Sequence, residues 1–334
     1  MKAFMIERYG DRNGGRIGEA PDPPVGAGDV LVRIHAASVN PLDLKLRDGD
    51  FKAILPYRLP LVLGNDLAGV VVQVGAAVTR FAVGDEVYAR PGKDRIGTFA
   101  ELIAVHQDDL AVKPAALTMA EAASLPLVAL TAWQALVERA RLRPGQKVLI
   151  HAGSGGVGTI AVQLAKHLGA YVAATASTAK TGLVKGLGAD IVVDYKRQAF
   201  ETVLDGYDVV LDTVGGETLE KSLRVLKPGG TVISVAGPPD AAFARELGAN
   251  AVLRLVMSAL SFRTRRRAGR RGVTYSFLFM KADGEQLRAL TELIDTGRIR
   301  PVVDRVFPFA ETREALEYVG EGRAKAGKVV VTMV

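Results

Sequence analysis

Apolar and polar residues follow two different patterns in the two parts of the chain. Residues 29–36 alternate as a half-buried strand does, and residues 68–74 and 86–89 are similar, with Gly and Pro between them. Near Leu117 the pattern of apolar residues changes, and from there short apolar runs alternate with stretches of helical periodicity. The first pattern, before Leu117, predicts a small β-barrel or sandwich. The second pattern predicts an α/β domain with a doubly wound parallel sheet.

The second pattern predicts a series of helices and strands. Helical patterns cover 127–140, 178–187 and 241–262, and strands are expected at 147–151, 171–176, 190–195, 208–213, 229–235 and 275–280. After these come a helix at 284–296, a strand at 302–307, a helix at 312–318 and a last strand at 328–333. In such a sheet the carboxyl ends of the strands hold ligands, so we expect contacts from Ser177, Tyr195, Val214 and Ala236.

A glycine turn follows the strand at 147–151. Gly153, Gly155 and Gly158 have the G-x-G-x-x-G spacing, and a helical pattern begins at Val157. Strand, glycine turn and helix together predict a dinucleotide site, since the turn lets the backbone and the helix N-terminus approach a pyrophosphate. We therefore assign Gly156 and Val157 to it as well as the three glycines. The alternative is a tight strand–helix turn with no ligand.

The end of the next strand indicates which dinucleotide binds. NAD sites usually place an acid there, but residues 171–189 contain no Asp or Glu and offer Ser177, Thr178 and Lys180. Hydroxyls and a lysine can bind a 2′-phosphate that an acid would repel, so NADPH is favoured over NADH. In the alternative interpretation Lys180 is an exposed helix lysine and Tyr195 packs at a strand end.

Composition narrows the classes of protein. The 334 residues suit two domains, and the absence of cysteine removes disulfides, thiolate metal sites and a cysteine nucleophile. We see no signal region and no membrane-spanning run, and we expect a cytoplasmic protein.

The net charge of +7 is local. It falls to +1 without the six arginines at 263, 265, 266, 267, 270 and 271. Such a patch could bind nucleic acid or an anionic membrane, although it lacks interleaved aromatics. A solvated loop is the competing interpretation.

Short motifs connect the chain to a known family from end to end. They are Val39-Asn40-Pro41-Leu42-Asp43, Gly64-Asn65-Asp66-Leu67-Ala68-Gly69, Gly84-Asp85-Glu86-Val87, Leu130-Thr131-Ala132-Trp133, the glycine turn, Asp212-Thr213-Val214-Gly215-Gly216 and Gly327-Lys328-Val329-Val330. In this order they resemble the zinc-independent, quinone-oxidoreductase-like branch of the medium-chain dehydrogenase/reductase superfamily. Residues 43–45 and 275–280 look most like those of alkenal/enone reductases.

The resemblance implies an enzyme with a Rossmann domain inserted into a GroES-like β-rich catalytic domain. The domains would be 1–123, 124–279 and a return at 280–334. Asn40 and Thr131 would lie near the nicotinamide, and Lys45 would bind its ribose or a substrate oxygen, unless Asn40 only forms a turn and Lys45 is solvated. The remaining cofactor contacts would come from Val235, Ala236, Gly237, Phe277, Leu278 and Phe279. A homodimer is possible.

The resemblance also implies a reaction without metal. Zinc-dependent relatives use a Cys and a Gly-His-Glu motif, where this chain has Asn40-Pro41 and Gly64-Asn65-Asp66. Its four histidines are scattered, so we expect no metal site. Alcohol oxidation needs a Lewis acid, whereas hydride addition to an activated C=C bond needs only donors to the enolate. We therefore expect NADPH-dependent reduction of α,β-unsaturated carbonyls or quinones, with Lys45 and Asn40 as the catalytic residues. The alternative function, of a different class, is a protein that binds nucleic acid or an anionic membrane through the arginines at 263–271.

Overall fold

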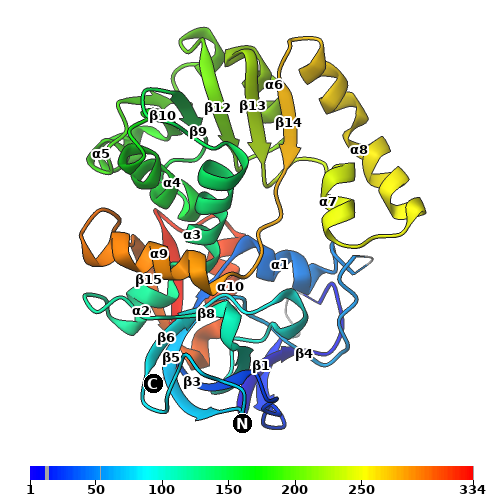
Figure 1. The fold of residues 1–334 in the computed structure, drawn as a ribbon, viewed down its shortest axis with the longest axis vertical. Coiled ribbons are helices and arrows are strands. Elements are labelled where there is room, and N and C mark those ends of the chain that lie inside the picture. Colours follow the sequence, from blue (N-terminus) through cyan, green and yellow to red (C-terminus); the bar gives the residue numbers. More distant parts are fainter. Residues whose placement is uncertain (12–14, 53, 334) are drawn as a thin grey trace. The chain divides into compact units, whose positions relative to one another are not determined.

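The computed structural model describes residues 1–11, 15–52 and 54–333. The chain divides into two compact units, one of Met1–Leu130 with Lys281–Val334 and one of Thr131–Met280 (Figure 1). The sequence placed the two breaks at residues 123 and 279. A middle segment is therefore inserted into a unit that both ends of the chain build.

The first unit is organised around one long strand, β3 (Asp29–Val39). It belongs to a seven-stranded sheet of order β15-β16-β3-β5-β6-β8, with β7 also paired to β3. The other strands are β5 (Leu67–Val74), β6 (Glu86–Ala89), β7 (Leu102–His106), β8 (Leu110–Val112), β15 (Val303–Pro308) and β16 (Lys328–Thr332). Because β16 pairs antiparallel with β3, the C-terminal segment reaches the N-terminal strands, as the inserted arrangement requires.

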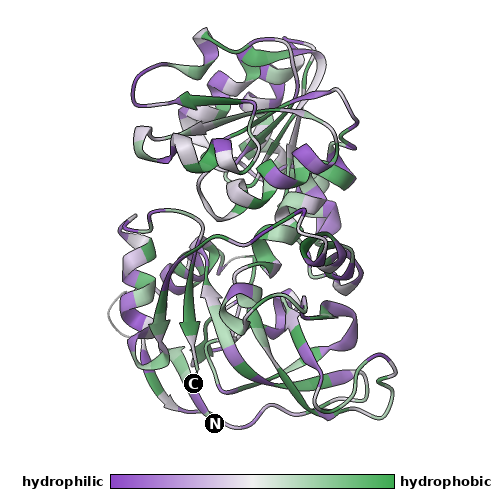
Figure 2. Ribbon diagram, turned by 90° about the vertical axis from the view of Figure 1, so that its left-hand side faces the viewer, coloured by the Kyte–Doolittle hydropathy of each residue, from purple (hydrophilic) through white to green (hydrophobic). Residues whose placement is uncertain are grey.

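Smaller elements complete this unit. A second sheet has the order β2-β1-β4, formed by Arg16–Glu19, Lys2–Ile6 and Leu61–Val62. The helices are α1 (Pro41–Asp48), α2 (Met119–Ala123), α9 (Gly284–Asp295) and α10 (Thr312–Gly320). In Figure 2 hydrophobic green recurs along the strands, and hydrophilic purple is frequent on loops and outer helices.

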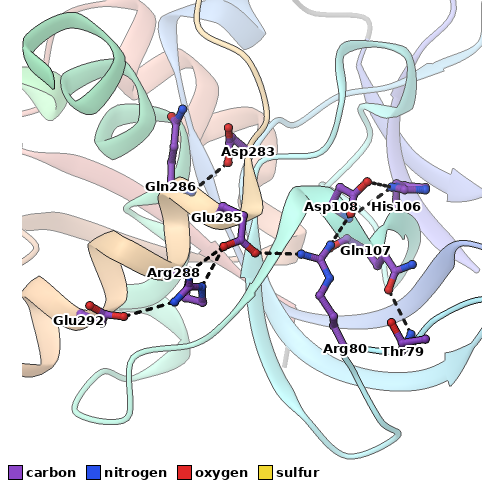
Figure 3. Close-up of polar contacts among 10 residues, drawn as sticks. All are labelled: Thr79, Arg80, His106, Gln107, Asp108, Asp283, Glu285, Gln286, Arg288 and Glu292. Carbon is purple, nitrogen blue, oxygen red and sulfur yellow. Dashed lines mark hydrogen bonds and ion pairs between the residues drawn. The ribbon is translucent and has the colours of Figure 1, made fainter. Parts of the chain in front are cut away.

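Helix α9 is joined to the β-strands by both polar and apolar contacts. Figure 3 shows Arg80 between Asp108 and Glu285, at 2.5 and 3.1 Å. Such exposed ion pairs contribute little to stability, because solvent screens them. The buried Tyr88 hydroxyl donates to the Leu287 carbonyl at 2.7 Å, beside the apolar inner face of α9. Burial of that face is the larger contribution.

The second unit is built on a six-stranded parallel sheet of order β11-β10-β9-β12-β13-β14. Its strands are Ile191–Asp194, Tyr171–Ala176, Lys147–Ile150, Tyr207–Asp212, Leu226–Ser234 and Thr274–Phe277. Its helices are α3 (Pro126–Trp133, which begins in the first unit), α4 (Gly156–His167), α5 (Thr181–Gly186), α6 (Gly216–Val225), α7 (Ala241–Glu246) and α8 (Ala251–Gly269). The predicted doubly wound fold is confirmed.

Several element boundaries differ from the prediction, and the helix expected at 127–140 is α3 followed by a π-helix at Gln134–Arg139. The single helix expected at 241–262 is two helices, because Gly248 turns the chain at φ +67° and Asn250 caps a new helix through the Leu253 N–H. The arginines at 263–267 continue α8, so the solvated-loop interpretation is wrong for them. The last strand, predicted at 275–280, ends at Phe277.

Candidate functional site

The glycine turn between β9 and α4 leaves no room for side chains at two of its glycines. A Cβ on Gly158 would lie 2.1 Å from the Ala152 carbonyl oxygen, and one on Gly153 would lie 2.9 Å from the Ala174 Cβ. Helix α4 begins at Gly156 with no side-chain cap on its first turn. The turn therefore presents backbone N–H groups and a helix dipole, which suits a diphosphate. Gly155 has more space, with its nearest contact at 3.3 Å.

The ends of β10 and β11 lie together, as predicted. The Tyr195 N–H donates to the Ala176 carbonyl at 3.2 Å, and Tyr195 is 58% exposed. Ser177 and Lys180 are half-buried in the turn that follows β10. Sequence reasoning missed Asp194, which accepts a hydrogen bond from the Thr178 hydroxyl at 2.5 Å. That contact and the Lys196 N–H lower the pKa of Asp194, so an ionised acid does border this site, supplied by the next strand.

Buried Asp212 organises the ends of β12 and β13. Its carboxylate accepts from the N–H groups of Val214 and Gly215 at 3.1 and 2.9 Å, and from the Ser234 hydroxyl at 2.6 Å. The Ser234 hydroxyl oxygen accepts in turn from the N–H of Gly237 at 2.8 Å and that of Ala236 at 3.3 Å. The backbone of three predicted residues, Val214, Ala236 and Gly237, is thus held by one carboxyl–hydroxyl pair, which sequence reasoning did not identify. The N–H of the fourth, Val235, donates to the backbone carbonyl of Asp212 at 3.0 Å.

The end of β14 is ordered by a second acid. Asp240 caps α7 and also accepts from the Phe277 N–H at 3.1 Å. Phe243 packs against Phe277 and Phe279, with ring centroids 5.0 and 5.5 Å apart, and the Leu278 N–H bonds the Ser234 carbonyl. The remaining predicted residue of this unit, Thr131, lies buried in α3.

His151, at the glycine turn, is part of the core. Its ring nitrogens lie 3.2 Å from the Thr175 hydroxyl and 2.8 Å from the Ser222 hydroxyl, and its ring meets Phe200 edge-on. Burial lowers the His151 pKa to about 4. It is therefore a neutral histidine packed in the core.

A buried polar cluster, which we call the Asp66 cluster, occupies the centre of the first unit. It contains Ser38, Asn40, Asp43, Asn65, Asp66 and Lys328. One oxygen of Asp66 accepts from the Ser38 hydroxyl at 2.7 Å, the Asn40 amide at 2.8 Å and the Lys328 ammonium at 3.3 Å. Its other oxygen accepts from the Leu127 N–H at 2.7 Å. Lys328 also donates to the amide oxygen of Asn40, so the orientation of that side chain is determined.

Asp43 forms the other half of the Asp66 cluster. It accepts from the Asn65 amide and from the Asn40 N–H, each at 2.7 Å, and so caps α1. Burial is the largest influence on its carboxyl and raises the Asp43 pKa to about 6. Burial likewise lowers the Lys328 pKa, which nearby Asp66 and Asp43 oppose. Two carboxyl groups and one ammonium are thus buried together and interact with each other.

The structure separates the two predicted catalytic residues. Asn40 lies inside the Asp66 cluster with its amide fully hydrogen-bonded. Lys45 lies exposed on α1, with its ammonium 6.0 Å from the Phe51 ring centroid. Sequence reasoning missed Lys328 as a member of the site, because only the pairing of β16 with β3 brings it to Asn40.

The donor set of the Asp66 cluster does not fit zinc. Zinc prefers thiolate, imidazole and free carboxylate ligands, but here two amides stand in those places and a lysine ammonium lies beside the carboxylate. Across the described parts of the chain, no group of three or more His, Cys, Asp or Glu side chains could hold a metal ion.

Comparison with known proteins places this geometry in a family. The description "alcohol dehydrogenase GroES-like domain" matches residues 26–115, and "zinc-binding dehydrogenase" matches residues 187–331. The 2-methylene-furan-3-one reductase of Solanum lycopersicum is 37% identical, over 99% of this chain and 79% of that protein. The NADPH-dependent alkenal/one oxidoreductase, chloroplastic, of Arabidopsis thaliana is 36% identical, over the same shares of 99% and 79%.

A solved structure extends the likeness to the whole fold. The quinone oxidoreductase from Coxiella burnetii has a TM-score of 0.87 at 31% identity, covering 100% of this chain and 99% of that one. Two family matches, relatives of this identity and an inserted parallel sheet with a glycine turn agree. The chain therefore belongs to the quinone-oxidoreductase-like family of the medium-chain dehydrogenase/reductase superfamily, and is an oxidoreductase that uses a nicotinamide cofactor.

Proposed function

We propose that the protein is an NADPH-dependent reductase of the activated C=C bond of α,β-unsaturated carbonyls or of quinones, and that it acts without zinc. The observation that carries the proposal is the Asp66 cluster, which combines amide donors and a buried ammonium with no set of metal ligands. Relatives whose names state quinone or alkenal/one oxidoreduction support the substrate class.

The preference for NADPH rests on the residues after β10. Ser177 and Lys180 can bind a 2′-phosphate, and β10 itself ends without an acid. Asp194 already accepts hydrogen bonds from the Thr178 hydroxyl and the Lys196 N–H, so both of its oxygens have partners within the protein. A free carboxylate at this point would favour NADH instead.

The chain's own residues orient and stabilise. When bound, the reduced cofactor supplies a hydride. Backbone N–H groups of the glycine turn would hold its diphosphate, and the loops fixed by Asp212 would hold its nicotinamide end. Asn40, whose side chain Lys328 holds in one orientation, would lie beside the nicotinamide. The Lys45 ammonium would donate to the substrate oxygen or to the cofactor ribose.

A spectrophotometric screen of NADPH oxidation over enones, enals and quinones tests the proposal. We expect turnover that a chelator leaves unchanged and that Lys45→Met lowers. Lys185→Met, at an exposed lysine on α5, is the matched control and should retain full activity. Turnover that a chelator abolishes and zinc restores would refute the metal-free chemistry.

Two further expectations stay predictions. They are a cytoplasmic location and a possible homodimer. Among the helices of the described residues, none is long and apolar enough to cross a membrane.

A further inference from the structure

Helix α8 presents an outward face that the oxidoreductase chemistry does not use. Its buried side chains, Met257, Ser261 and Ala268, lie on one side of the helix. The opposite side follows the i, i+3, i+4, i+7 spacing from Val252 to Arg270, and its members are exposed: Val252, Leu255, Val256, Ala259, Leu260, Arg263, Arg266, Arg267 and Arg270. The face changes from apolar to basic part of the way along the helix.

The first half of this face is unusually apolar for a surface. Val252 and Leu255 are 71% and 72% exposed, and Leu260 is 58% exposed. Val256 and the neighbouring Phe262 are exposed too, so five large apolar side chains gather on one helix. Single exposed apolar residues need no explanation, but a contiguous group marks an interaction surface.

The second half of the face carries concentrated positive charge. Arg263, Arg266, Arg270 and Arg271 are exposed, and Arg267 pairs with Glu220 of α6. Arg265 does not belong to the face, because its guanidinium folds back onto the Ser258 and Ser261 hydroxyls. Five of the six arginines of the cluster are therefore exposed beside an apolar surface.

The helix is held firmly enough to serve as a docking element. Asn250 caps its N-terminus at 2.9 Å from the Leu253 N–H, and the Arg254 guanidinium donates to the Ala249 carbonyl at 2.7 Å. Its inner side packs on α7, α6 and β14. The orientation of the outward face is thus set by the second unit alone.

The combination of surfaces selects one kind of partner. Nucleic acid would engage the arginines but leave the apolar half exposed, since the patch offers no aromatic stacking platform beyond Phe262. A second copy of the chain would bring its own arginines. If two such faces overlapped fully, either the two basic halves would meet or each basic half would lie on the apolar half of the other copy. An anionic lipid surface satisfies both halves: apolar side chains enter the acyl boundary and arginines bind phosphate.

We propose that the outward face of α8 docks the protein reversibly onto an anionic lipid surface. The apolar half, Val252 to Leu260, would insert between headgroups, and the basic half, Arg263 to Arg270, would neutralise lipid phosphates. The enzyme would then be peripheral, lying on the membrane without spanning it.

Vesicle flotation with the purified full chain tests this proposal. We expect the protein to float with vesicles of phosphatidylcholine and phosphatidylglycerol, and not with phosphatidylcholine alone. A triple variant, Arg263→Gln, Arg266→Gln and Arg270→Gln, should lower the bound fraction at least tenfold. The control triple Arg143→Gln, Arg224→Gln and Arg298→Gln removes the same charge from other exposed arginines and should bind as the native chain does.

Salt separates the two halves of the face. Residual binding at high salt should depend on the apolar half and disappear in Leu255→Ser with Leu260→Ser. Equal flotation of both arginine triples, or tighter binding to duplex DNA than to anionic vesicles, would overturn the proposal. So would a concentration-dependent dimer that the Leu255 and Leu260 changes disrupt in a chain that does not float. Turnover of a water-soluble enone should be unchanged in all α8 variants, so failure here leaves the proposed activity standing.

Discussion

The two units hold their candidate site residues in place in different ways. In the second unit the candidate contacts come mostly from backbone groups. The glycine turn has no room for side chains at two of its glycines, and Asp212, Ser234 and Asp240 hold loop N–H groups in place. In the first unit the Asp66 cluster is made of side chains, with two acids and a lysine buried together. A backbone site tolerates little added volume, whereas a charged cluster tolerates little change in charge.

The backbone site should fail completely when volume is added. A Cβ on Gly158 would lie 2.1 Å from the Ala152 carbonyl oxygen, so Gly158→Ala must displace the glycine turn. We expect the dissociation constant of the nicotinamide cofactor to rise at least a hundredfold, about 3 kcal/mol. Gly182→Ala, where no atom lies within 4 Å, is the control and should bind normally. Calorimetric titration measures both, and native affinity in Gly158→Ala would contradict this description of the turn.

The charged cluster should fail when one charge is removed. Lys328→Met leaves Asp66 buried without its cation, which should lower the free energy of unfolding by about 3–5 kcal/mol. The double variant with Asp66→Asn removes both charges and should recover part of that loss. Lys93→Met, which breaks an exposed pair with Asp94, should cost at most about 1 kcal/mol. Urea unfolding would refute the account if Lys328→Met were as stable as the native chain.

The two sets of residues were not equally predictable. The glycine turn, the parallel sheet and the residues that follow each strand could be predicted from local spacing, because parallel strands deliver their ends to one edge. The partnership of Lys328 with Asn40 could not be predicted, since it depends on β16 pairing with β3 across almost the whole chain. Asp194 escaped attention for a similar reason, because it acts from the strand beside the expected one.

The two units should also respond to pH in opposite directions. The Asp43 pKa is raised from 3.8 to about 6, so the native state binds the proton more tightly than the unfolded chain does. Its contribution to stability is full below pH 3.8 and is lost as pH rises through about 6, a change of about 3 kcal/mol. Unfolding of native and Asp43→Asn chains from pH 4 to 7 measures the difference, with Asp94→Asn as the exposed control. A constant difference would contradict the raised pKa of the buried Asp43.

His151 supplies the opposite sign in the second unit. Its pKa is lowered from 6.5 to about 4, so its contribution is present above pH 6.5 and is lost as pH falls towards about 4, again about 3 kcal/mol. His151→Gln should remove this acid-side loss, whereas His167→Gln, at an exposed histidine, should not. Parallel acid titrations of the two variants would contradict the comparison.

The smallest expected effect concerns cofactor choice. Lys180→Ala should weaken NADPH binding by about 1.5–3 kcal/mol and barely change NADH binding, because only NADPH carries the 2′-phosphate. Asp194→Asn should shift the preference further towards NADPH, since it removes the acid beside Thr178. Equal affinities of the native chain for the two cofactors would exclude a phosphate site at the end of β10.

The most direct measurement of the central claim follows the hydride. An enone is reduced with NADPH deuterated at the transferred position, and the product is analysed by NMR and mass spectrometry. The exposed Lys45 ammonium can donate to the oxygen of an enolate, so deuterium should appear at the β-carbon of a saturated ketone. An allylic alcohol labelled at the carbinol carbon would contradict the account, because it would show reduction of the carbonyl group itself.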